Sequence, residues 1–160
     1  MAGAFRLRRV EIDPASLAAA SREAEHERQV AIFDLVEQNV FRPAGAEEGP
    51  FELKLSVEEQ RLVMEVTGPD YGRKHLLSLS PFRRVMRDYA LICSSYAEAV
   101  RDSTPAQIEA VDMGRRGLHD EGSRLLIERL AGKIELDHET ARRLFTLIYT
   151  LGRWGESSPR

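Results

Sequence analysis

The chain contains one cysteine, Cys93, only three lysines and one tryptophan, and it lacks long apolar runs. A single cysteine excludes an intrachain disulfide and a cysteine-rich zinc site. No run of about 18 consecutive apolar residues is present, which excludes a membrane-spanning helix. No apolar stretch follows the arginines near the N-terminus, as a secretory signal would require. These absences lead us to expect a cytoplasmic protein.

Length and composition are typical of one folded domain. The chain has 160 residues, of which 42% are hydrophobic and 31% charged, far from the composition of disordered proteins. We expect residues 1–152 to form a single domain and residues 153–160 to form a flexible C-terminal tail. The net charge of −3 and the pI of about 5.9 argue against an attraction of the whole protein to nucleic acid.

Arginine is strongly preferred over lysine, since it supplies 20 of the 23 basic residues. The guanidinium group is a planar fork that suits phosphate or carboxylate. GC-rich coding is the alternative explanation, because it replaces lysine by arginine throughout a proteome. Four adjacent arginine pairs occur, namely Arg8-Arg9, Arg83-Arg84, Arg115-Arg116 and Arg142-Arg143.

The first half of the chain predicts a strand, a helix and a meander. Apolar and basic residues alternate over residues 5–12, which indicates a short strand at a sheet edge. Residues 21–40 show helical spacing, with an inward face of Val30, Phe33, Val36 and Val40. A loop is expected over residues 42–50. Three short alternating strands over residues 51–57, 62–66 and 75–79 then predict an antiparallel meander.

The second half predicts three helices. Ser80-Pro81 supplies a capping hydroxyl and a first-turn proline for a helix that reaches Val100. Thr104 and Gln107 have the spacing of a capping box at the start of the next helix, and a final helix begins near Asp137. Strands followed by helices indicate the α+β class. We predict a small antiparallel sheet, a three-strand meander plus an N-terminal strand, covered by about four helices.

Three glycines interrupt the helical pattern between Pro105 and Ala131, namely Gly114, Gly117 and Gly122. Together they cost roughly 2 to 3 kcal/mol relative to alanine in a helix. Close packing of a neighbouring group against bare backbone is one explanation. The other is a break over residues 114–122 that presents backbone N–H groups to a ligand such as phosphate. No nucleotide-binding motif is present, so no cofactor is expected.

The same segment contains the candidate functional residues. Arg115, Arg116 and His119, with Gly114 and Gly117, form the predicted binding set for an anionic group. His119 and Glu121 are the acid–base candidates if the protein is an enzyme, although neighbouring helical residues point in different directions. The four histidines lack metal-ligand spacing, so no metal site is predicted. Burial in the apolar face of its helix is the interpretation for Cys93.

Several blocks of the sequence are similar to a known family. They are EHERQVAIFDLVEQN (residues 25–39), SPFRRVMRDYALICSSYAEAV (80–100), DMGRRGLHDEG (112–122) and RLAGKIELDHETARRLFTLI (129–148). The chain resembles, from about Arg9 to Leu151, an uncharacterised family of short alphaproteobacterial proteins designated by an uncharacterised-protein number. The resemblance implies a bacterial cytosolic protein that forms one unit. It implies no substrate, cofactor or catalytic residue.

Three functional hypotheses follow. The first is a non-enzymatic binding or regulatory domain whose arginines at 115 and 116, with His119, meet an anionic group on a protein, a nucleotide or RNA. The second is an enzyme of unknown class that uses His119 and Glu121. The third is a self-associating structural protein, which predicts an exposed apolar patch of several hundred Å². The sequence leaves the partner and the oligomeric state open, and it predicts no contact with a membrane.

Overall fold

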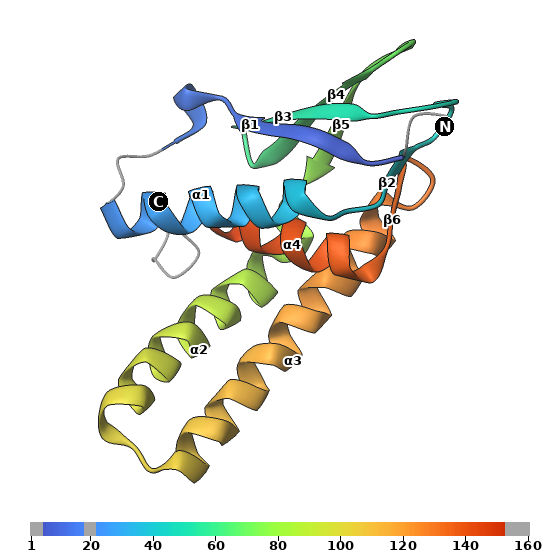
Figure 1. The fold of residues 1–160 in the computed structure, drawn as a ribbon. Helices are drawn as coiled ribbons and strands as arrows, with labels where there is room; N and C mark the ends of the chain where they lie inside the picture. The colour runs from blue at the N-terminus through green and yellow to red at the C-terminus, as the bar shows by residue number, and fades with distance from the viewer. Residues whose placement is uncertain (1–4, 18–21, 153–160) are drawn as a thin grey trace.

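The structure, a computed structural model, describes residues 5–17 and 22–152 and has the predicted α+β architecture (Figure 1). The predicted tail, residues 153–160, lies outside the described residues. No helix among the described residues is long and apolar enough to cross a membrane. The strands are β1 (Leu7–Ile12), β2 (Phe41–Pro43), β3 (Phe51–Glu58), β4 (Arg61–Gly68), β5 (Tyr71–Ser78) and β6 (Ile134–Leu136). The helices are α1 (Arg22–Glu37), α2 (Arg83–Asp102), α3 (Pro105–Leu130) and α4 (His138–Tyr149), with short 3-10 turns η1 (Pro14–Ser16) and η2 (Ser80–Phe82).

The main sheet has four strands in the order β1-β3-β4-β5. Strands β3, β4 and β5 form the predicted antiparallel meander, and β1 lies at the edge as expected. The expectation of an all-antiparallel sheet is wrong in one respect, because β1 runs parallel to β3. The connection between these two strands passes through a helix, α1, which returns the chain to the end of the sheet where β1 began.

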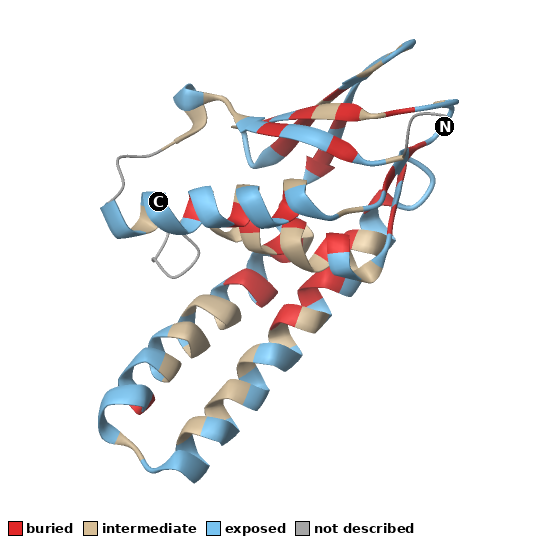
Figure 2. Ribbon diagram, viewed as in Figure 1, coloured by how far each residue is buried: buried red, intermediate tan, exposed pale blue. Residues whose placement is uncertain are grey.

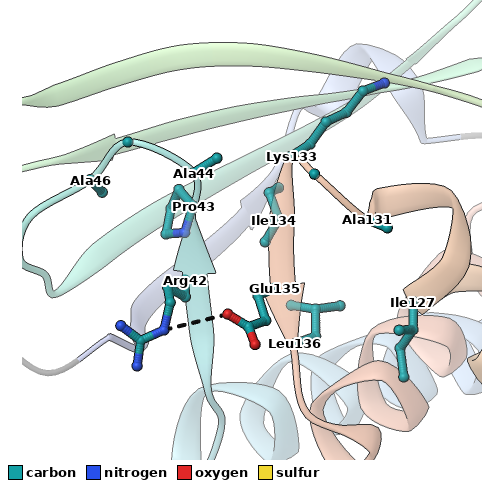
Figure 3. Close-up of a pocket in the computed structure, with 12 residues that line it drawn as sticks. Arg42, Pro43, Ala44, Ala46, Ile127, Ala131, Lys133, Ile134, Glu135 and Leu136 are labelled. Atoms are coloured by element: carbon teal, nitrogen blue, oxygen red, sulfur yellow. Dashed lines mark ion pairs between the residues drawn. The ribbon is translucent and has the colours of Figure 1, made fainter.

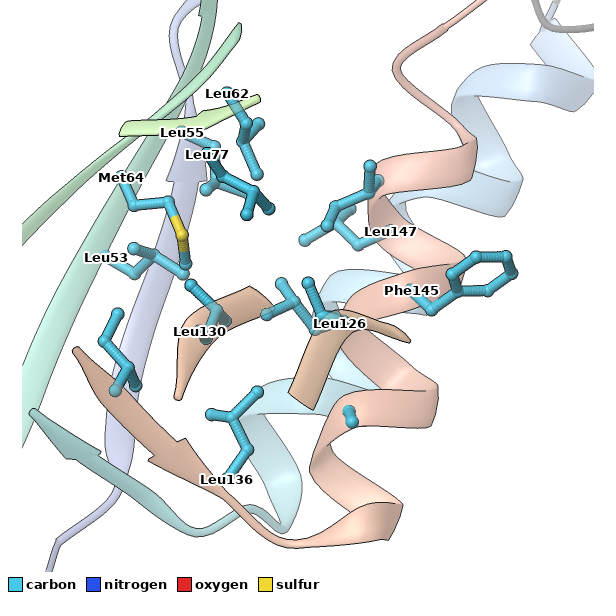
Figure 4. Packing of buried hydrophobic residues seen from close by; sticks show 14 of the residues in the cluster. Leu53, Leu55, Leu62, Met64, Leu77, Leu126, Leu130, Leu136, Phe145 and Leu147 are labelled. Carbon is cyan, nitrogen blue, oxygen red and sulfur yellow. The ribbon is translucent and has the colours of Figure 1, made fainter. Parts of the chain in front are cut away.

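One face of the sheet forms the core. Alternate residues of β3 and β4 point toward the helices, and Leu53, Leu55 and Met64 are almost completely buried. They meet Leu126 and Leu130 from the end of α3 and Leu147 from α4 (Figure 4). The period-two pattern of the strands therefore identified the inward face of the sheet correctly.

The predicted inward face of the first helix is wrong for three of its four residues, because Val36 alone among them packs against the core. Val30, Phe33 and Val40 are exposed, and the buried residues of α1 are Arg28, Ala31 and Leu35. Apolar side chains are found around more than half of this helix, so the periodicity alone permitted either face. Packing of α1 against α4 and β1 buries the stripe formed by Arg28, Ala31 and Leu35. The Arg28 Nη2 also donates a hydrogen bond to the carbonyl of Thr150 at 3.3 Å.

A second, two-stranded sheet was missed. Residues 42–50 were predicted as a loop, but β2 begins at Phe41 and pairs in antiparallel fashion with β6. Only three residues of each strand take part, and the partners are more than 90 positions apart in sequence. A three-residue strand carries too little alternation to be recognised locally.

Helices α2 and α3 form an antiparallel hairpin that projects from the body of the protein, and most of its far half is exposed or partly buried (Figures 1 and 2). The predicted capping box of Thr104 and Gln107 is present at the start of α3. The predicted cap at Ser80 is wrong, because Ser80 and Pro81 belong to the turn η2 and no side chain caps the start of α2. At α4, Asp137 caps the helix by accepting from the Thr140 N–H.

Candidate functional site

Helix α3 is continuous through all three glycines. Its backbone N–H groups over residues 114–122 are therefore within the helix, and the alternative of a break that presents them to a ligand is wrong. A Cβ added at Gly122 would collide with the ring of Phe145, whereas one at Gly117 would meet open space. At Gly114 the nearest atom is the terminal methyl of Ile92, at 2.7 Å. Close packing explains Gly122, and nothing in the structure requires glycine at position 117.

His119 is turned into the junction of α2, α3 and α4. Only 9% of the residue is exposed, and its ring lies edge-on to Tyr89 and Phe145, with centroids 5.5 and 5.1 Å away. Its Nε2 lies 2.8 Å from the hydroxyl oxygen of Thr146. His119 is therefore part of the packing between the helices and does not lie on the surface that presents the two arginines.

The hydrogen bonds assign the tautomer of His119. The Thr146 hydroxyl donates its one proton to the carbonyl of Arg142 at 3.1 Å, so it accepts from an Nε2–H of the imidazole. The other nitrogen, Nδ1, is buried without a hydrogen-bond partner in the structure. Burial, with smaller contributions from the charges of Arg142 and Arg115, lowers the pKa of His119 to about 4. The ring is therefore neutral at pH 7 and a weak base.

Arg115 and Arg116 share one carboxylate. Asp112 accepts from Arg115 Nη2 at 2.5 Å and pairs with Arg116 Nη2 at 3.0 Å. The hydrogen bond from Arg115 lowers the pKa of Asp112, which is therefore ionised at neutral pH. Arg115 also lies over the ring of Tyr96, with Cζ 4.1 Å from the centroid, while 75% of the Arg116 side chain is exposed. The cluster keeps one net positive charge.

The structure does not bring the two acid–base candidates together. Glu121 faces Arg84 on α2, with Oε2 3.4 Å from Nη2, and His119 points to the opposite side into the aromatic junction. Asp120, between them in sequence, accepts instead from His138 at 2.7 Å. Cys93 is half-buried, and burial raises the pKa of its thiol, so the thiol is protonated at neutral pH. No paired nucleophile and base are assembled among these residues.

A pocket of about 440 Å³ lies beside the β2–β6 ribbon, where the sequence had predicted only a loop (Figure 3). Its lining is mostly apolar and includes Ile127 and Leu136, and Arg42 Nε lies 3.7 Å from Glu135 Oε1 at its wall. The side chain of Lys133 runs away from this pair. The lining therefore contains two basic residues, Arg42 and Lys133, and one acidic residue, Glu135, beside its apolar walls.

Metal-binding geometry is absent from residues 5–17 and 22–152, where no three His, Cys, Asp or Glu side chains gather as ligands. The sequence indicates Asp112 as a partner for Arg116, because ion pairs four residues apart are a local signal. It missed Tyr96 as a platform for Arg115, because that contact joins two helices and has no local signal.

Comparison with known proteins places the chain among close relatives. It is 64% identical over 146 residues to a UPF0262 protein of Phenylobacterium zucineum, which covers 91% of this chain and 92% of the relative. A UPF0262 protein of Caulobacter vibrioides is 61% identical with the same coverage. One from Rhizobium etli is 53% identical over 94% of this chain and 96% of its own length. No solved structure matches.

The family model matches residues 4–153, which is nearly the whole chain and includes every described helix and strand. This range agrees with the resemblance inferred from the four sequence blocks. The relatives carry only the family designation, and so they assign no activity to the α3 cluster or to the pocket. The chain belongs to the uncharacterised protein family UPF0262.

Proposed function

We propose that the protein is a non-enzymatic binding domain that holds an acidic side chain of a partner protein against α3, at Arg115 and Arg116. One observation carries the proposal: a single carboxylate, Asp112, serves both guanidinium groups. The surplus positive charge lies on the projecting hairpin, where a partner can approach without contacting the sheet (Figure 1). Arginine binds carboxylate in a forked geometry, and that geometry suits an acidic group.

The packing of Arg115 supports this function. Its guanidinium is held between Asp112 and the face of Tyr96, so little side-chain freedom remains to be lost when a partner binds. A preordered arginine beside an aromatic ring is the type of residue that contributes most at protein interfaces. Arg116, being largely exposed, contributes charge and orientation.

The neighbourhood of Arg116 favours a protein over a nucleic acid. Met113 precedes it by three residues on the same helix face and is 67% exposed. Gly117, beside both, leaves open space above the backbone. Methionine and arginine are enriched at protein interfaces.

The test is a binding titration with defined probes. A labelled peptide rich in Glu and Leu, a short RNA, ATP and inorganic phosphate are each titrated into the purified protein at low salt. We expect the acidic peptide to bind, and the double variant Arg115→Ala plus Arg116→Ala to weaken it by about tenfold. Arg83→Ala plus Arg84→Ala, an adjacent pair at the base of the hairpin, is the matched control.

Comparing the two double variants shows whether the peptide binds at Arg115 and Arg116 or responds to any loss of two positive charges. An equal loss in both would contradict the proposed surface, and so would an acidic peptide that does not bind. Preferential binding of RNA or nucleotide would overturn the choice of a protein partner. Circular dichroism of both double variants checks that the hairpin remains helical.

Self-association is a second candidate, favoured by one observation. Val30 and Phe33 lie on the same exposed side of α1, and 64% of Phe33 is exposed. An apolar pair of this kind is often covered in an oligomer. Sedimentation velocity of the wild type and of Phe33→Ser tests it, and a monomer at high concentration would remove its support.

A further inference from the structure

The two edges of the main sheet differ in how they are protected. At the β1 edge, the Asn39 side chain occupies both hydrogen-bonding groups of Leu7. The Leu7 N–H donates to Asn39 Oδ1 at 2.6 Å, and Asn39 Nδ2 donates to the Leu7 carbonyl at 3.1 Å. Helix α1 also packs beside this strand. A further strand therefore has no free place to begin pairing with β1 at Leu7.

The opposite edge, formed by β5, has no comparable cover. Strand β5 is last in the sheet order, and β4 is the only element of the described chain with which it makes extensive contact. Its register with β4 is unbroken from Tyr71 to Ser78, and it contains neither a proline nor a bulge. Alternate backbone groups along these eight residues therefore point away from β4. Such an edge is a template for an added strand.

Charges alternate in sign across the outer face of the sheet. Glu11 lies opposite Lys54, which lies opposite Glu65, which in turn lies opposite Lys74. Residues of opposite charge on facing positions stabilise neighbouring strands. The row ends at Lys74, because β5 is the last strand and no residue lies opposite Lys74 on its outer side. An acidic residue on a fifth strand would continue it.

The next row on the same face is apolar at the open edge. Val63 of β4 lies opposite Leu76 of β5, and Leu76 is 47% exposed. Lys74 and Leu76 are two residues apart, so they point to the same side of the sheet. A strand paired with β5 would cover Leu76 with an aliphatic side chain while placing its acidic residue opposite Lys74.

We propose that the open edge of β5 binds an extended segment of another protein, in which Asp or Glu is separated by one residue from Val, Ile or Leu. Backbone hydrogen bonds hold the segment, and the two side-chain rows select its sequence. A second copy of this chain is the poorer occupant, because its β5 offers Lys74 where the row requires a carboxylate. This surface is separate from the α3 cluster, and the proposal does not depend on it.

The experiment uses a labelled peptide of about ten residues. Glu and Val alternate along one of its faces and Thr fills the other, and a second peptide has Lys in place of each Glu. Fluorescence anisotropy measures binding to the full-length protein. Hydrogen–deuterium exchange of residues 71–78 locates the site, because outward-pointing amides of β5 become protected only when a strand is added there.

We expect the Glu peptide to bind more tightly than the Lys peptide and to slow exchange in β5. Lys74→Gln should weaken it by about threefold, and Lys74→Glu should reverse the preference between the peptides. Lys54→Gln is the matched control, since the same change on the same face lies two strands from the edge. All of these measurements are made in the Arg115→Ala plus Arg116→Ala background, which removes the α3 cluster as a second site for an acidic peptide.

Three results would overturn the proposal. The first is equal affinity for the two peptides, and the second is tight binding without protection of β5. The third is a concentration-dependent protection of β5 in the absence of peptide, which would assign the edge to a second copy of this chain.

Discussion

Gly122 of α3 lies directly against the aromatic ring of Phe145 of α4, so closely that even one methyl group would overlap the ring. Phe145 is fully buried and also contacts Tyr89 of α2, so it has no space into which it can move. Three helices therefore meet at a point where one of them has no side chain. This contact is where the projecting hairpin joins the body of the protein.

Alanine substitutions at the three glycines of α3 should change the free energy of unfolding in different ways. Gly122→Ala should lower the free energy of unfolding by about 1 to 2 kcal/mol, because overpacking exceeds the gain in helix propensity. Gly117→Ala should raise it by about 0.5 to 1 kcal/mol, because the site is open. Gly114→Ala should have a small effect, since the Ile92 methyl can turn aside. Urea denaturation measures all three, and a stabilising Gly122→Ala would contradict the described packing.

The stability of the protein should fall in mild acid because His119 is buried as a neutral ring. Its pKa is lowered from 6.5 to about 4, so below pH 6.5 the unfolded chain takes up a proton that the folded protein does not. About 2 to 3 kcal/mol should be lost between pH 6.5 and pH 4, and none above that range. His119→Gln should flatten this part of the curve.

Three other groups affect the dependence of stability on acid pH. The pKa of His75 is also lowered by burial, so His75→Gln serves as the comparison variant and should remove only a smaller part of the slope. The pKa values of Asp112 and Asp120 are lowered from 3.8, so the stability that these ionised carboxylates contribute is lost only below about pH 3.8. An NMR titration of His119 with a midpoint above pH 6 would contradict this account.

Removing the side chain that covers the β1 edge should destabilise the fold. Asn39→Ala leaves the Leu7 N–H and carbonyl without their partner, which should cost about 2 kcal/mol in urea denaturation. The variant should also aggregate more readily in dynamic light scattering, because a second sheet edge is opened. Gln38→Ala, at the exposed neighbouring residue, is the control and should change stability by less than about 0.5 kcal/mol. Equal effects of the two variants would refute this role of Asn39.

The capping box at Thr104 should stabilise the tip of the hairpin. Its hydroxyl accepts from the Gln107 N–H at 3.3 Å, and the Gln107 side chain accepts from the Thr104 N–H at 3.0 Å. Thr104→Ala should cost about 1 kcal/mol and speed amide exchange in the first turn of α3. Thr104→Ser keeps the hydroxyl and should behave like the wild type. Unchanged exchange in the alanine variant would show that the cap is dispensable.

The candidate site was only partly predictable. The ion pair of Asp112 with Arg116 is a contact within one helix, and the four-residue spacing alone indicates it. His119 was grouped with these arginines because it follows them closely in sequence. The structure separates it from them, since Thr146 and Phe145 of α4 draw its ring into the helix junction. No pattern within α3 indicates which side α4 occupies.

The sequence by itself determined the elements that depend on neighbours along the chain. These are the alternating strands of the meander, the capping box at Thr104 and the start of the last helix near Asp137. Each rests on hydrogen bonds or spacing within a few residues. Local physical chemistry is enough to specify them.

Only the tertiary structure decided the features made by distant partners. The parallel direction of β1, the pairing of β2 with β6, the buried face of α1 and the contact of Gly122 with Phe145 all join segments far apart in sequence. Each of these was one of several arrangements that local patterns allowed. Packing of the whole chain selected among them, because burial and steric exclusion are properties of the assembled core.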